Sequence, residues 1–224
     1  MLAPEPRLPE ARALIEQRRF LGVHAPRQTG KTTTLAALAA DLTAEGRFAA
    51  VRFSCETART APDDGIAEDR ILGAIRLAAR STLTPELQPP ARWPDATPGS
   101  RLRDGLSAWA GQCPLPLVLF FDEIDAALGN ALLNVLSQLR DGYTARDQTP
   151  FPASAVLCGL RDVRDYRVAA GADPDRIGRL TSRSSIREDS PGWSMRSRGR
   201  SPGRCGCRSR SRSRPRTWTR RKSG

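Results

Sequence analysis

The sequence predicts an α/β fold with a parallel central sheet covered by helices on both faces, and three observations support this prediction. Short apolar segments alternate with segments of helical periodicity up to about residue 160. A glycine-lysine loop at residues 25–32 lies between the first apolar segment and a helical one. A continuous apolar run that begins at Leu115 ends in acidic residues, as expected for a strand buried on both faces.

Periodicity and turn residues give the individual elements in order. Residues 9–20 interleave charged residues with apolar ones, which predicts an amphipathic helix. Gly46 is placed to end the next helix, because glycine adopts the left-handed backbone at little cost. Prolines interrupt residues 84–100, which we interpret as a surface excursion within one domain. The predicted helices are 9–20, 31–46, 65–80, 101–113 and 126–143, and the predicted strands are 20–25, 48–55, 115–125 and 154–160.

The net charge of +12 belongs to the end of the chain. Of the 36 basic and 24 acidic side chains, 14 and 2 lie in residues 181–224, so the first 180 residues carry equal numbers of each. The composition of this neutral body therefore gives no indication of nucleic-acid binding. We predict two parts: a folded domain over residues 1–180, and an Arg- and Ser-rich tail over residues 181–224. The tail is too poor in apolar residues to order itself, and we expect it to be disordered.

Cysteine, histidine and hydropathy argue against several classes of protein. Five cysteines are an odd number without the spacing of a disulfide framework, which favours a reduced, cytoplasmic location. The single histidine, His24, argues against a His-rich metal site and against a Ser-His-Asp triad. The chain has no apolar run near the ~18 residues that cross a bilayer and no signal-peptide pattern. We therefore expect a soluble protein without a membrane partner.

The segment APRQTGKT, residues 25–32, matches the phosphate-loop pattern of Ala or Gly, four residues of any type, and Gly-Lys-Ser/Thr. Gly30 lets the backbone curl so that its N–H groups face phosphates, Lys31 places a cation beside the β- and γ-phosphates, and Thr32 offers a hydroxyl to Mg²⁺. The start of the following helix adds the positive end of its dipole. The alternative is a glycine-lysine turn that binds nothing, which the strand before it and the helix after it disfavour. The candidate phosphate-binding residues are Ala25, Pro26, Arg27, Gln28, Thr29, Gly30, Lys31, Thr32 and Thr33.

Two adjacent carboxylates end the apolar run LVLFFDEID. Asp122 is the candidate metal ligand together with Thr32, and Glu123 is the candidate base that polarises an attacking water. Because the ligands of parallel sheets bind at the carboxyl ends of the strands, this position suits a site. The alternative is a solvated turn after a strand. We interpret Asp125 as the cap of the following helix.

The segments HAPRQTGKT, LVLFFDEID and SAVLCGLRDVRDY together resemble the prokaryotic AAA-like ATPases. These form a branch of the additional-strand P-loop class, which also contains signal-transduction ATPases with numerous domains. The resemblance covers about residues 20–166 and implies a three-layer sandwich with an ATP–Mg²⁺ site. It places Lys31 and Thr32 on the phosphates, Asp122 on the metal and Glu123 on the water.

The resemblance also implies a polar sensor at the end of the fourth strand, a position that Arg161 occupies here. The alternative for Arg161 is an ordinary surface arginine. Ser54, at the end of the second strand, is a further candidate, which would couple to Glu123 in the manner of a glutamate switch.

The family pattern continues with parts that this sequence lacks in recognisable form. The sheet order 5-1-4-3-2 requires a fifth strand beside the phosphate-loop strand, followed by a helical lid over the base. After residue 180 neither is recognisable, so we predict an incomplete fold with the strand at 20–25 as an exposed apolar edge, and a weakened affinity for ATP.

Three interpretations of the tail stay open. It is a basic arm that binds nucleic acid, with Trp193 and Trp218 stacking on bases; a solvated tail without a role; or an out-of-frame translation of a GC-rich gene. We favour the third, because the apolar pattern is lost abruptly.

The predicted function is ATP binding with Mg²⁺-dependent hydrolysis to ADP and phosphate, in the service of a protein partner that the sequence does not identify. The alternative is a nucleotide-binding switch or a truncated remnant that binds without turnover. A nucleic-acid partner is expected only through the tail, and the sequence does not determine an oligomeric state.

Overall fold

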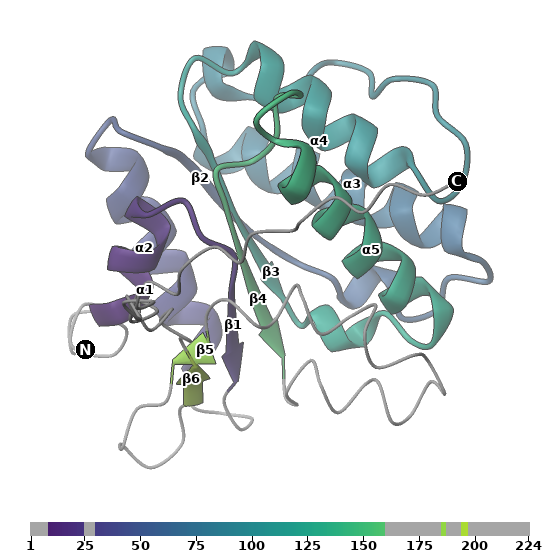
Figure 1. Ribbon diagram of the computed structural model, residues 1–224, viewed down its shortest axis with the longest axis horizontal. Coiled ribbons are helices and arrows are strands. Elements are labelled where there is room, and N and C mark those ends of the chain that lie inside the picture. The colour runs from purple at the N-terminus through teal and green to yellow at the C-terminus, as the bar shows by residue number, and fades with distance from the viewer. Residues whose placement is uncertain (1–8, 25–29, 160–184, 187–193, 197–224) are drawn as a thin grey trace, which may run out of the picture.

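The computed structural model describes residues 9–24, 30–159, 185–186 and 194–196, and these form a sandwich of three layers (Figure 1). A sheet of four parallel strands lies in the middle, in the order β2-β3-β4-β1. The strands are β1 (Leu21–His24), β2 (Ala49–Ser54), β3 (Leu117–Asp122) and β4 (Ser154–Gly159). The predicted α/β class with a parallel central sheet is therefore confirmed.

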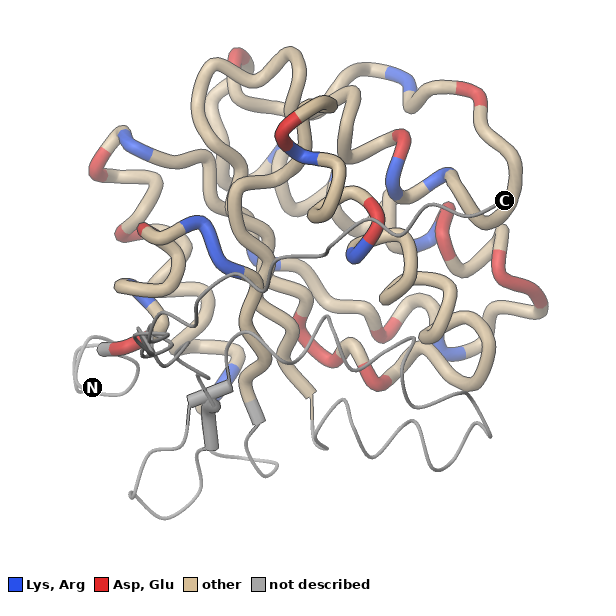
Figure 2. Tube along the Cα trace, in the orientation of Figure 1, with Lys and Arg blue, Asp and Glu red and all other residues tan. Residues whose placement is uncertain are grey.

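Helices cover both faces of the sheet, as Figure 1 shows. One layer consists of α1 (Pro9–Glu16) and α2 (Lys31–Ala44); the other consists of α3 (Asp64–Thr82), α4 (Arg101–Gln112) and α5 (Asn130–Ala145). Short 3₁₀ helices lie at Glu56–Ala58, Pro85–Leu87 and Ile124–Ala126. No helix in the described part of the chain is long and apolar enough to cross a membrane. Basic and acidic residues are spread over both helical layers (Figure 2).

The alternation of side chains along each strand divides the apolar residues into two cores. On β3, Leu119 and Phe121 pack with α3, α4 and α5, whereas Val118 and Phe120 pack with α1 and α2. All six residues of β3 are buried, because both of its faces are covered and β2 and β4 flank it. A central strand of this kind is apolar up to Asp122 at its end, which explains why its sequence shows no alternation.

The register of the sheet brings the carboxyl ends of the strands together. Ser54 lies opposite Asp122 across the β2–β3 pair, and His24 lies opposite Gly159 across the β1–β4 pair. The backbone N–H of Cys55 extends the first pair by donating to the carbonyl oxygen of Asp122 at 2.8 Å. The segments that directly follow these strands in the sequence therefore begin at the same edge of the sheet.

Most predicted elements are present, and their ends differ for local reasons. The first helix ends at Glu16 rather than at residue 20, because Arg18 adopts a left-handed backbone with φ of 54°. Gly46, with φ of 70°, follows α2 and confirms its predicted role as a stop. The interpretation of Asp125 as a helix cap is wrong: α5 begins at Asn130 behind Gly129, and Asp125 lies in a preceding 3₁₀ turn.

Residues 84–100 belong to the same domain, as predicted, but they are tied to it more firmly than a surface excursion implies. The indole N–H of Trp109 donates to the carbonyl oxygen of Leu87 at 3.0 Å. The backbone N–H of Gly99 donates to the carboxylate of Glu68 at 2.7 Å, and Glu68 is fully buried. These two contacts connect both ends of the segment to the helical layer of α3 and α4.

The expectation that the strand at residues 20–25 is an open edge is wrong for the described residues. β6 (Ser194–Arg196) pairs with β1 in the antiparallel sense, with Met195 opposite Val23, and β5 (Ser185–Ile186) follows beside β6. The neighbour of β1 is thus three residues long and antiparallel, not the parallel fifth strand of the 5-1-4-3-2 order. The segment in which the family has its lid, a part that we predicted to be missing here, lies outside the described residues, as do the sensor position at Arg161 and most of the tail.

Candidate functional site

The phosphate-loop sequence enters α2 at the edge where the strands end. Gly30 precedes the helix with φ of 76° and ψ of 20°, a left-handed conformation that glycine adopts without a steric penalty. Its carbonyl oxygen accepts the first bond of the helix, from the N–H of Thr34 at 3.0 Å. Lys31 begins the helix, and Thr33 is exposed on its first turn. Five of the predicted loop residues lie outside the described part of the chain, namely Ala25, Pro26, Arg27, Gln28 and Thr29.

Thr32 and Asp122 meet although 90 positions separate them in the sequence. The hydroxyl of Thr32 donates to Asp122 Oδ2 at 2.8 Å, and Asp122 is only 1% exposed. Asp122 is the last residue of β3, and its side chain is on the face of the sheet that α2 covers. The two residues predicted to share a metal are therefore in direct contact.

Arg52 is a third member of this contact that the sequence analysis did not predict. Its guanidinium donates to Asp122 Oδ2 from Nη2 at 2.6 Å and from Nε at 3.2 Å. Arg52 and Asp122 have even positions on neighbouring strands whose register pairs Ser54 with Asp122, so both side chains are on the α2 face, diagonally adjacent. The signal in the sequence was an arginine between the apolar residues Val51 and Phe53 of an edge strand. The partner of this arginine can be identified only once the register of β2 against β3 is known.

The second oxygen of Asp122, Oδ1, is buried and accepts no hydrogen bond from a nitrogen or oxygen atom of the described residues. Mg²⁺ binds hard oxygen ligands and takes one or two from the protein, with phosphates and water completing its shell. An aspartate oxygen beside a threonine hydroxyl fits that requirement. Within the described residues no group of three or more His, Cys, Asp or Glu side chains forms a metal cage, so a metal here needs the ligand's own oxygens.

Glu123 directly follows Asp122 but points to a different partner. Its backbone is left-handed, with φ of 56° and ψ of 43°, which is uncommon for a residue with a side chain. Its Oε2 accepts a hydrogen bond from Ser54 Oγ at 2.9 Å. The predicted proximity of Ser54 and Glu123 is confirmed, and the carboxylate is held towards the end of β2.

Two cysteines, Cys55 and Cys158, are buried near the carboxylates of this edge. Burial, followed by the charge of Asp122, raises the pKa of the Cys158 thiol from its ordinary 9.0 to about 12, while the charge of Lys31 acts in the opposite direction. Burial and the charges of Asp122 and Glu123 also raise the pKa of Cys55. Both thiols stay protonated near neutral pH, so neither is a nucleophile. The negative charges of Asp122 and Glu123 favour the binding of a cation at this edge of the sheet.

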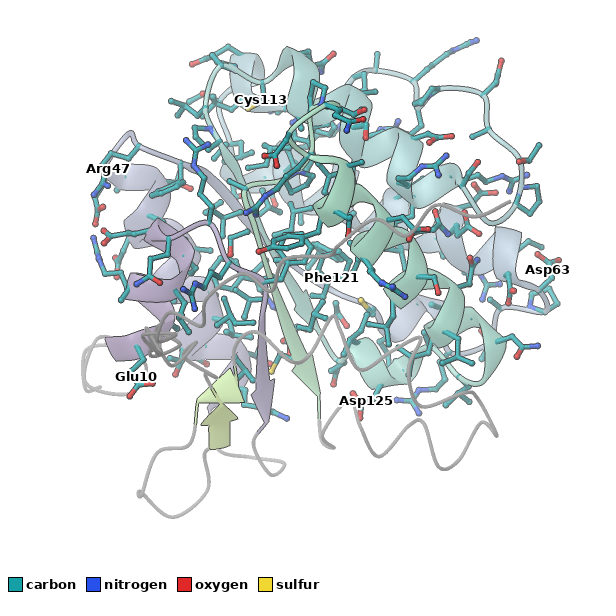
Figure 3. The ribbon with its side chains drawn as sticks, in the orientation of Figure 1. Glu10, Arg47, Asp63, Cys113, Phe121 and Asp125 are labelled. Carbon is teal, nitrogen blue, oxygen red and sulfur yellow. The ribbon has the colours of Figure 1, made fainter. Side chains whose placement is uncertain are left out.

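Asp125 lies at the same edge, on the turn after β3 (Figure 3). A Cβ added at Gly159 would come within 3.4 Å of Asp125 Oδ1, so the turn packs closely on the end of β4. Three acidic residues, Asp122, Glu123 and Asp125, are thus gathered where β3 ends and α2 begins. Of the predicted site residues, the structure brings Thr32 into contact with Asp122. Lys31 and Glu123 are their neighbours in the sequence, and Arg161 lies outside the described residues.

A family of known proteins matches most of this chain. The family model described as ATPase family associated with various cellular activities (AAA) matches residues 21–178. No curated protein matches the chain. The matched segment contains the phosphate-loop sequence, all four parallel strands and the carboxylate pair.

Proposed function

Because the chain belongs to the ATPase family associated with various cellular activities (AAA), whose domains are ATP-binding ATPases, we propose that it binds ATP with Mg²⁺ and hydrolyses it slowly. The observation that carries this proposal is the hydrogen bond of 2.8 Å between Thr32 and Asp122. It joins the start of the phosphate-loop helix to the end of the acidic strand. A site that only held phosphate would not need this second strand.

The position of each residue indicates its role in this proposed site. Lys31 and the free N–H groups at the start of α2 would bind the phosphates. Thr32 and Asp122 would hold Mg²⁺, which when bound neutralises charge on the phosphates. Glu123 would orient the attacking water and accept its proton. Arg161 stays a predicted sensor, and the nearness to prokaryotic and signalling branches of the family stays a prediction as well.

Replacement of Lys31 by alanine tests the binding part of the proposal. We expect the Kd for a fluorescent ATP analogue to rise by about tenfold or more, because a charged donor to the phosphates is lost. Equilibrium titration by fluorescence anisotropy measures this change. Arg47→Ala is the matched control, since it removes a charge from an exposed residue at the opposite end of β2 and should leave the Kd unchanged (Figure 3). Unaltered binding by Lys31→Ala contradicts the proposal.

A second candidate function is a nucleotide-dependent switch with little turnover. The observation that favours it is the hydrogen bond from Ser54 to Glu123, which holds the proposed base towards β2. In this function the bound nucleotide would set the conformation presented to a protein partner, and a rearrangement of Glu123 would be required before hydrolysis.

Removal of the Ser54 hydroxyl distinguishes the two functions. If Ser54 restrains Glu123, Ser54→Ala is expected to raise the rate of phosphate release several-fold, because one charge-assisted hydrogen bond no longer holds the carboxylate. A coupled phosphate-release assay under saturating ATP measures the rate. Ser81→Ala is the control, because that hydroxyl donates only within its own helix, to the carbonyl oxygen of Ala78. A rate equal to or lower than that of the unmodified chain argues against a restraining role.

A further inference from the structure

We infer that Arg52 is the resident counter-charge of Asp122 and that Mg²⁺ has to displace it, so that metal entry is coupled to movement of Arg52 into an adjacent groove. This inference rests on the proposed function, since it concerns the same metal site. It adds Arg52 as a positioning residue, and it adds a competition between Arg52 and Mg²⁺ for Asp122. Neither the sequence motifs nor the family assignment implies these two features.

Asp122 Oδ2 already accepts all the hydrogen bonds that an oxygen can accommodate. It receives Thr32 Oγ1 at 2.8 Å, Arg52 Nη2 at 2.6 Å and Arg52 Nε at 3.2 Å. A carboxylate oxygen offers about two lone pairs, so three donors leave none for a metal. Thr32 is itself a proposed metal ligand, and its hydroxyl points at this same oxygen. The other oxygen, Asp122 Oδ1, is buried within the protein. A cation bound between Thr32 Oγ1 and Asp122 Oδ2 therefore has to take a place that Arg52 now holds.

Burial explains why Arg52 is there at all. Asp122 is 1% exposed, and an isolated buried carboxylate carries a large desolvation cost unless a cation pairs with it. Arg52 supplies that cation from the neighbouring strand, and its own side chain is 26% exposed. Asp122 is fixed at the buried end of β3, whereas the side chain of Arg52 extends to the surface. Only Arg52 is therefore able to move away from the pair.

A groove beside Arg52 provides the space for it. The groove has a volume of about 1020 Å³ and runs along β2 between α2 and α3. Its walls are mainly small residues, including Ala40, Ala74 and Gly73, and Arg52 itself lines it. No Asp or Glu is among the described residues that line the groove. A displaced Arg52 would be solvated there without a new carboxylate partner, so it returns to Asp122 when the metal leaves.

The test measures metal affinity rather than turnover. Mn²⁺ replaces Mg²⁺ as the probe, and electron paramagnetic resonance measures its Kd in the presence of a fixed, saturating concentration of a non-hydrolysable ATP analogue. Arg52→Met keeps most of the length of the side chain and removes its charge. We expect Arg52→Met to bind Mn²⁺ about tenfold more tightly or better, because the metal no longer competes with a charged pair. Arg52→Lys should lie between the two, since a lysine cannot make both contacts.

A second readout uses the metal-free, nucleotide-free protein. Arg52→Met should lower its thermal unfolding midpoint, because Asp122 loses its counter-charge, and saturating Mn²⁺ with the ATP analogue should raise the midpoint of this variant more than that of the unmodified chain. The control is Arg70→Met, which removes the other arginine of the groove. Arg70 donates to Thr57 and Thr60, not to Asp122, so the Kd for Mn²⁺ and the rise in midpoint that Mn²⁺ with the analogue produces should stay unchanged.

The outcomes separate this inference from the proposed function. If the unmodified chain binds Mn²⁺ with the analogue and Arg52→Met binds it equally or more weakly, the inference is overturned and the proposed function stands. If neither protein binds Mn²⁺ with the analogue, the proposed function is overturned, and the inference with it. Tighter binding by Arg52→Met, together with unchanged binding by Arg70→Met, supports the displacement.

Discussion

Glu123→Gln is expected to slow phosphate release by ~10²–10⁴-fold, because a general base contributes that much to a proton-transfer step. The amide has nearly the shape of the carboxylate but does not accept a proton from water. ATP should still bind, since the proposed binding contacts come from Lys31, Thr32 and Asp122. Single-turnover phosphate release and a nucleotide titration, performed on the same preparation, measure the two effects separately.

Glu86→Gln is the matched control for this experiment. It makes the same glutamate-to-glutamine change at an exposed residue of the 3₁₀ helix Pro85–Leu87, outside the candidate site, where the carboxylate accepts a hydrogen bond from Thr84. Its rate should stay near that of the unmodified chain. Equal rates for Glu123→Gln and the unmodified chain would remove the assignment of Glu123 as the base. In that case the nucleotide-dependent switch becomes the better description of the domain.

The sheet was predictable because its residues carry strong local signals. The continuous apolar run of β3 indicates a strand that is buried on both faces, and the structure confirms it. Gly30 and Gly46 were predicted to occupy special backbone positions, and both have positive φ. The pairing of Thr32 with Asp122 follows from the same reasoning, since parallel strands place their carboxyl ends at one edge. In each case the sequence pattern itself contains the cause.

Other features depend on distances that a sequence pattern does not contain. Arg52 meets Asp122 because the register of β2 against β3 places them diagonally on one face, and a shift by one residue would turn Arg52 to the other face. Asp125 looked like a helix cap because it precedes an apolar helical segment. The structure instead places a 3₁₀ turn and Gly129 between Asp125 and α5. The position beside β1 was expected to be empty, because β6 lies in a segment without an apolar pattern.

Trp109→Ala is expected to destabilise the domain by ~3–5 kcal/mol, the cost of truncating a fully buried large aromatic side chain. Trp109 is 0% exposed in the core between the sheet and α3, α4 and α5, and it fixes residues 84–100 through its hydrogen bond to Leu87. The truncation therefore leaves a cavity and also a buried carbonyl without this donor. Urea unfolding at a constant m value measures the change in the free energy of unfolding.

Trp93→Ala gives the comparison that identifies the cause. Trp93 packs edge-on against Trp109, with ring centroids 6.5 Å apart, but it is only partly buried, and its indole nitrogen has no hydrogen-bond partner among the described residues. Its truncation removes less buried area and breaks no described hydrogen bond of the indole, so its cost should be clearly smaller. If the two substitutions cost the same, residues 84–100 contribute to stability through the aromatic pair itself. A larger cost for Trp109→Ala means instead that the anchor at Leu87 and the filled core carry that contribution.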